Sequence, residues 1–153
     1  MFDSTDILTQ DEIFALQKKY LVDPTALQNL ALRATAALFS GGRQFVTEIG
    51  DALYGQRAPT GFIDPVDREI QLLTLFTISR EWSQLAIHCY WSLLVGMTPF
   101  DIAQTLLLAS MGAGIDEYVA ALGVMTKVMT LLKRLAPTEP SPEEVVSELT
   151  KAF

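Results

Sequence analysis

The sequence predicts an all-α fold, a single-domain bundle of about seven or eight helices. Three observations support this fold class: helix-start signals recur along the chain, apolar residues repeat at helical spacing between them, and no segment shows the alternation of a strand. The chain has 153 residues, of which 50% are hydrophobic. That length suits one domain over residues 1–153, with enough apolar surface for one core.

Helix starts are indicated where a capping residue precedes a proline. Asp, Ser and Thr accept hydrogen bonds from the first backbone amides of a helix, and proline lacks an N–H that would be left without a partner there. Such pairs stand at Asp23-Pro24, Asp64-Pro65, Thr98-Pro99 and Ser141-Pro142. Capping boxes are expected at Thr9 with Glu12 and at Ser141 with Glu144, and they define the first and last helices.

Apolar residues keep helical period over residues 27–38 and 118–132. Glycines at 41–42, 96 and 112–114 and the segment 55–62 are typical of turns, and residues 136–140 predict a short stiff linker. We expect residues 65–78 and 80–95 to form an antiparallel helical hairpin that turns near Ser79 and Arg80.

Charge and composition exclude several classes of protein. The net charge of −7, with no cluster of Lys or Arg, argues against nucleic-acid binding. The acidic N-terminus does not resemble a secretory signal, so a cytoplasmic location is expected. Residues 82–100 carry no charge, but they are too polar and too broken by Gly96 and Pro99 for a membrane span. Cys89 is the single cysteine, which excludes an intrachain disulfide.

Residues 102–115 and 119–132 are apolar on more than one helical face. A chain of this length has few other elements to cover them, so self-association is expected. The alternative is a central helix wrapped by its own chain.

The candidate site centres on His88, the single histidine. On a helix, Glu81, Gln84 and His88 fall at i, i+3 and i+7 and share one stripe. In the predicted hairpin, Glu69 lies within about one helical turn of His88. A carboxylate, an amide and an imidazole in this arrangement could transfer a proton. The alternatives are a buried core histidine and ordinary surface carboxylates.

Other candidate roles are weaker. A metal site at Glu69, Glu81 and His88 has too few strong ligands, and helical di-iron sites need paired Glu-x-x-His elements, so no metal is expected. Cys89 points about 100° away from His88 on a helix and suits packing. Trp82 is expected in the core or in the wall of a pocket.

Residues 64–122 resemble the carboxymuconolactone decarboxylase and alkylhydroperoxidase D superfamily. The resemblance rests on Asp64-Pro65-Val66-Asp67-Arg68-Glu69-Ile70, on the His88 helix, and on Gly96-Met97-Thr98-Pro99-Phe100-Asp101-Ile102, which is similar to the family's Gly-Val-Thr-Pro-Glu-Glu-Ile. It implies an all-helical core with a central helical hairpin. The chain departs from the family at residues 112–116 and at Gln104, which leaves the substrate open.

The family's peroxidases use Cys-x-x-Cys-x-x-x-His with an upstream glutamate. Aligning that motif places Glu81 and Gln84 at the two cysteine positions and retains Glu69 and His88. Peroxide reduction through a disulfide is therefore not expected. The decarboxylase branch implies cofactor-free loss of CO2 from a small lactone or unsaturated carboxylic acid, in a trimer or hexamer.

In this branch we expect His88 as acid or base with Glu69, Glu81 and Gln84 in the site. Arg68 and Arg80 are candidate anchors for a substrate carboxylate. Two alternatives stay open. The first is a non-catalytic oligomeric binding or scaffold protein of the same fold. The second is an antioxidant peroxidase that depends on Cys89 and an external thiol.

Overall fold

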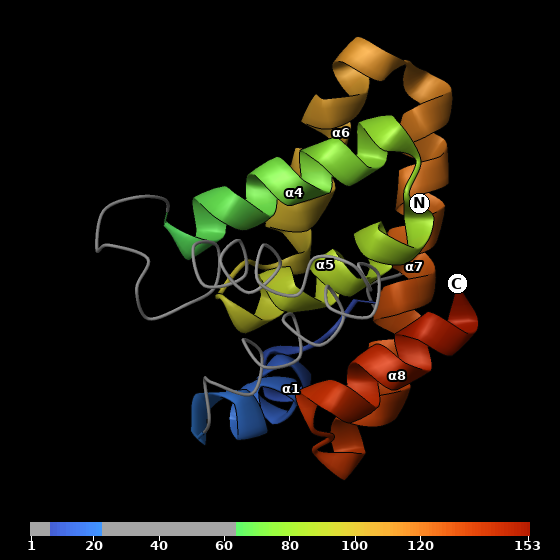
Figure 1. Cartoon of the computed structure of the whole chain (residues 1–153). Coiled ribbons are helices and arrows are strands. Elements are labelled where there is room, and N and C mark those ends of the chain that lie inside the picture. Colours follow the sequence, from blue (N-terminus) through green and yellow to red (C-terminus); the bar gives the residue numbers. More distant parts are fainter. Residues whose placement is uncertain (1–6, 23–63) are drawn as a thin grey trace, which may run out of the picture.

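The computed structural model describes residues 7–22 and 64–153 (Figure 1). The central helix of this part of the chain is α5 (Trp82–Leu94). In Figure 1, α5 lies between α4 (Pro65–Ser79) on one side and α1 (Gln10–Val22) and α8 (Pro142–Ala152) on the other. It also contacts α6 (Pro99–Ala113) and α7 (Ile115–Leu135). Nine of its residues are buried, as its uncharged sequence predicts.

The described residues form six α-helices and one 3-10 helix, and they contain no strand. This confirms the all-α class. The helix expected after Asp23-Pro24, with its apolar residues at 27–38, lies outside the described residues, as do the turns expected at 41–42 and 55–62. The count of about seven or eight helices for the whole chain therefore stays a prediction.

The capping signals set the helix starts as expected. Asp64 Oδ1 accepts a hydrogen bond from the Val66 amide at 2.8 Å, and Pro65 begins α4. At α8, Ser141 and Glu144 form the predicted capping box. Thr9 and Glu12 form the other one, before α1. Each box satisfies backbone amides that a helix N-terminus leaves without partners.

The α4–α5 hairpin turns at Arg80, as predicted, but α5 begins at Trp82 and not at Arg80. Arg80 adopts a left-handed conformation with φ of 60°, which ends α4. The Glu81 amide then donates to the Phe76 carbonyl at 3.0 Å and closes the turn. The predicted range of 80–95 is thus shortened at both ends, to Trp82–Leu94.

The α6 and α7 helices form a second hairpin that turns at Gly114. This residue has a φ of 115°, where a side chain would strain the backbone. In Figure 1 the connection lies at the opposite end of the molecule from α1 and α8. The α7 helix has acidic residues in its first turn and basic residues in its last, which matches the helix dipole.

The predicted linker at 136–140 begins as a 3-10 helix, Ala136–Thr138. The Thr138 hydroxyl donates to the Leu135 carbonyl at 2.8 Å and closes this extra turn, which the proline-rich sequence did not indicate. Within the described ranges, none of the helices combines the length and apolarity needed to cross a membrane.

Candidate functional site

Glu69 is drawn into the core by the helical face on which it lies. Glu69, Leu73 and Thr77 follow one another at intervals of four residues, and all three side chains are buried. The α4 helix packs against α5 and α6, and the face that carries Glu69 meets α5. A carboxylate without solvent contact needs partners inside the protein, because an unpaired buried charge costs several kcal/mol.

His88 is the partner of Glu69 on α5. Its Nδ1 lies 2.7 Å from Glu69 Oε2, and the side chains of His88 and Glu69 are 4% and 0% exposed. This contact places the two residues at the same height of the hairpin, as the sequence predicted. A carboxylate can only accept a hydrogen bond, so with Glu69 as a carboxylate the donor of this contact would be an Nδ1 proton, and Nε2 would be the nitrogen left for acid-base chemistry.

Arg68 completes the charge arrangement from the other side of the carboxylate. Its Nε donates to Glu69 Oε1 at 3.0 Å, and its side chain is 14% exposed. The guanidinium is the permanent charge in this row, and its Nε–H gives the buried carboxyl group of Glu69 a hydrogen-bond donor. Arg68, Glu69 and His88 therefore form a continuous row, with one oxygen of the carboxylate serving each neighbour.

Two aromatic side chains hold the imidazole ring. The centroid of Phe76 lies 5.0 Å from that of His88 in a tilted contact, and that of Trp91 lies 4.7 Å away, edge to face. Neither was predicted as a site residue, although Phe76 follows Glu69 by seven residues and Trp91 follows His88 by three. That helical spacing is the signal that could have indicated both.

The other predicted catalytic residues do not join the row. Glu81 is exposed at the N-cap of α5 and makes no capping hydrogen bond with its side chain. Gln84 is half-buried. Within residues 7–22 and 64–153, the hydrogen bonds of the His88 ring involve Glu69 and neither of these two residues. Glu81, Gln84 and His88 keep the expected spacing in the sequence, but the hydrogen bond of the His88 ring is to Glu69 on α4.

Arg80 and Trp82 have other contacts. Arg80 forms an ion pair with the buried Glu117, with its Nε 3.0 Å from Oε2, and so ties the α4–α5 turn to the start of α7. Trp82 is half-buried against the hydrophobic core. The aromatic neighbours of His88 in the described part of the chain are Phe76 and Trp91.

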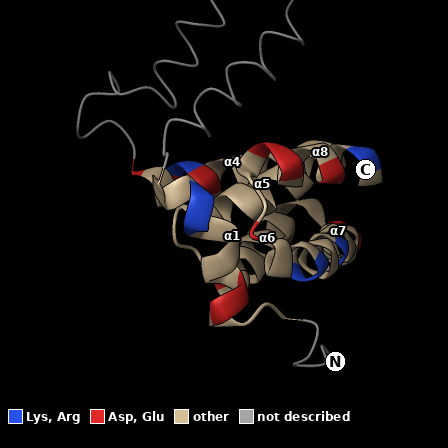
Figure 2. Cartoon of the chain, turned by 90° about the horizontal axis from the view of Figure 1, so that it is seen from below, with Lys and Arg blue, Asp and Glu red and all other residues tan. Residues whose placement is uncertain are grey.

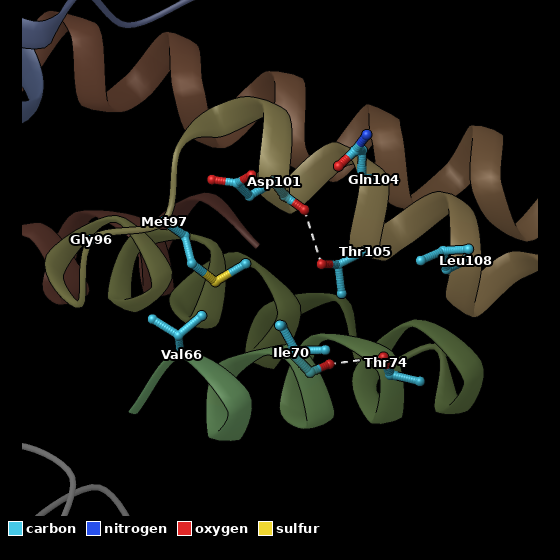
Figure 3. Close-up of a pocket in the computed structure, with 9 residues that line it drawn as sticks. All are labelled: Val66, Ile70, Thr74, Gly96, Met97, Asp101, Gln104, Thr105 and Leu108. Atoms are coloured by element: carbon cyan, nitrogen blue, oxygen red, sulfur yellow. Dashed lines mark hydrogen bonds between the residues drawn. The ribbon is translucent and has the colours of Figure 1, made fainter. Parts of the chain in front are cut away.

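A hollow of about 370 Å³ lies between α4 and α6, and no residue of the row lines it (Figure 3). Val66, Ile70 and Thr74 face α6 along one side of α4, whereas Glu69 faces α5. The threonine hydroxyls in the hollow bond to carbonyls of their own helices, as the dashed lines in Figure 3 show. Its remaining polar groups are the Asp101 carboxylate and the Gln104 amide.

A second hollow, of about 330 Å³, is apolar and lies between the start of α1, α6 and α7. Its lining includes Leu8, Phe100 and Met129. His88 lines neither hollow. The described residues also contain no group of three or more His, Cys, Asp or Glu side chains placed to hold a metal ion.

Cys89 is buried beside His88 in sequence but belongs to the hydrophobic core. Burial raises the pKa of its thiol to about 12. At neutral pH the thiol is therefore protonated, which is the unreactive form.

Comparison of the chain with known proteins gave no match to a family model, to a curated protein or to a solved structure. The resemblance described above thus rests on the residues quoted for it.

Proposed function

We propose that this protein is a carboxymuconolactone decarboxylase-like acid-base enzyme that acts without a cofactor on a small lactone or unsaturated carboxylic acid. The observation that carries the proposal is the 2.7 Å contact between His88 Nδ1 and Glu69 Oε2. In catalytic His–carboxylate pairs, a carboxylate on one imidazole nitrogen fixes the tautomer and the orientation of the ring, so that the other nitrogen can face the substrate.

In the proposed reaction the substrate loses its carboxylate as CO2. The electrons of the broken C–C bond move into a conjugated carbonyl and form a dienolate. The imidazolium of His88 then delivers the proton on Nε2 to carbon, and water restores the proton to the ring. Glu69 stabilises the imidazolium, and Arg68 balances the charge of Glu69.

Residues outside the row complete the proposal. Glu81, at the N-cap of α5, and Gln84, in its first turn, precede His88 by seven and four residues and are proposed to face the substrate. The guanidinium of Arg68 or Arg80 is proposed to bind the substrate carboxylate, with Trp82 in the wall. Following the resemblance, we also propose a cytoplasmic homo-oligomer, a trimer or hexamer, in which a neighbouring copy completes the pocket.

The test is turnover of carboxymuconolactone and related small lactone acids, measured as CO2 release. Glu69→Gln and His88→Gln should lower kcat/KM at least ~100-fold, since general acid-base catalysis supplies that much or more. Glu148→Gln is the matched control, because it removes a carboxylate that lies on α8, away from the row. Circular dichroism checks that each variant is folded. Full activity in both row variants would show that the site is wrongly assigned.

A second candidate is a non-catalytic oligomeric binding or scaffold protein, and the tight packing of the row favours it. His88 is 3% exposed and Glu69 is 0% exposed. In this case the pair is structural, and apolar residues of similar volume could replace it at little cost in stability. Diethyl pyrocarbonate, which modifies imidazoles, distinguishes the two candidates. Modification of His88 in the folded protein, slowed by a bound lactone acid, supports catalysis, whereas complete resistance supports the structural role.

A further inference from the structure

An apolar face covers the outer side of α6 and includes Ile115 and Val119 in the first turns of α7, where Asp116 is also exposed. Residues 102–115 contain no charged side chain. In Figure 2 charged segments stand out on α7 and α8. On this face stand six exposed large apolar side chains: Phe100, Leu107, Leu108, Met111, Ile115 and Val119. We call this set the α6 face.

The α6 face belongs to a firmly packed hairpin. On α6, Phe100, Leu107 and Met111 recur at i, i+7 and i+11, while Ile102 and Leu106 point into the core and are fully buried. The exposed side chains are thus held outward by the same helical register that buries the others.

The area of the α6 face matches that of a stable protein interface. Leu108 is 67% exposed and Met111 is 77% exposed. At their exposed fractions the six side chains present roughly 700 Å², close to the ~800 Å² that each partner contributes to a standard interface. The largest apolar patch of a monomeric protein is typically about 300–600 Å².

Charge indicates which partner fits. Each copy carries a net charge of −7, so two copies repel through most of their surfaces. The α6 face, where the exposed charged side chains are Asp101 and Asp116 near its two ends, is where they approach at least cost. A lipid surface fits poorly, because helices that lie on membranes combine their apolar side with Lys and Arg, which residues 102–115 lack.

Shape also favours a second copy. Leu108 borders the hollow between α4 and α6, and Phe100 borders the hollow between α1, α6 and α7. The α6 face is therefore a ridge with a recess on each side. A surface that carries both a ridge and recesses can fit a second copy of the chain, as the contacts of a closed oligomer require.

We propose that the α6 face is the surface through which copies of this chain associate. This proposal rests on the homo-oligomer of the proposed function and names the surface through which that oligomer forms. It does not depend on the chemistry of His88. Turnover and oligomeric state are separate measurements, so one can fail while the other stands.

The test is sedimentation equilibrium of the full chain. Leu108→Lys with Met111→Lys should raise the dissociation constant at least ~100-fold relative to the wild-type oligomer. The matched control is Phe14→Lys with Leu21→Lys on α1, where both side chains are similarly exposed. Both pairs change the net charge equally. The control should assemble like the wild type.

If the lysine variant does not fold, the α6 face can be tested instead by the rate at which a cysteine placed on it is alkylated. With Met111→Cys, raising the protein concentration should slow alkylation of the new thiol at least ~10-fold, whereas Phe14→Cys should react at one rate throughout. A wild-type monomer at ~100 µM would overturn the proposal, as would equal disruption by the two lysine pairs. A monomer whose Met111→Cys thiol is protected at all concentrations would show that another part of the same chain covers the face.

Discussion

Burial decides which chemistry single side chains of α5 can perform, and Cys89 gives the clearest case. The pKa of its thiol rises from 9.0 to about 12 on burial. At pH 8 the folded protein therefore holds about 1,000-fold less thiolate than an exposed cysteine. We predict that iodoacetamide does not modify Cys89 at pH 8 until urea unfolds the chain.

The same shift has a consequence for stability. The folded state retains the thiol proton of Cys89 to higher pH than the unfolded chain does. The contribution of Cys89 to the free energy of unfolding is therefore fully present below pH 9 and is lost as the pH rises from 9 to about 12. Rapid alkylation of Cys89 in the folded protein would contradict this account and would strengthen the thiol peroxidase alternative.

At the same scale, the residues of the row were predictable only in part. Helix spacing and hairpin geometry brought Glu69 to His88, because both depend on the regular rise of a helix. The packing of Phe76 and Trp91 on the ring depends on how α4 and α5 rotate against each other, which one sequence does not specify. For the same reason the polar partner of His88 is on the neighbouring helix, and not at Glu81 or Gln84.

At the scale of elements, the capping box at the start of α6 controls a helix that carries much of the exposed apolar surface. The Thr98 hydroxyl accepts from the Asp101 amide, while Asp101 Oδ2 accepts from the Thr98 amide at 2.8 Å. Asp101 Oδ2 also accepts from the Thr98 hydroxyl at 2.7 Å, and this hydrogen bond, followed by the one from the Thr98 amide, lowers the pKa of Asp101 below 3.8. We predict that Thr98→Ala lowers the free energy of unfolding by about 1 kcal/mol at pH 7.

The pH dependence of this cap follows from the direction of the shift. A lowered carboxyl pKa contributes stability above the unfolded value of 3.8, and that contribution is lost as the pH falls through the folded value. The difference between Thr98→Ala and wild type in urea unfolding should therefore shrink below pH 4. A constant difference from pH 7 to pH 3 would show that the Asp101 carboxylate has no part in the cap.

The helix boundaries show how far local signals reach. Asp64-Pro65, Thr98-Pro99 and Ser141-Pro142 start helices in the structure, because capping involves only neighbouring residues. The Thr98–Asp101 box was not predicted, since the pattern sought Glu or Gln at the fourth position. The left-handed Arg80 was not predicted either, because its conformation is supported by closure of the turn and by an ion pair with Glu117 on α7.

At the scale of the whole molecule, α5 is the element on which the others pack. We predict that Leu85→Ala, at a fully buried position of α5, lowers the free energy of unfolding by about 2–5 kcal/mol through lost burial and a residual cavity. Leu75→Ala is the matched control, because this leucine of α4 is 56% exposed. Its effect should be within about 0.5 kcal/mol of zero. Equal effects in chemical denaturation would mean that α5 is not the centre of the core.

The most direct test of the central claim is nitrogen NMR of the single imidazole in the protein labelled with 15N. If Glu69 accepts the Nδ1 proton of His88, the neutral ring is held as the Nδ1–H tautomer, opposite to the tautomer that free histidine prefers. Glu69→Gln should mix the tautomers, and Glu148→Gln should leave the spectrum unchanged. An Nε2–H ring in the wild type, or identical spectra for wild type and Glu69→Gln, would contradict the proposed pair.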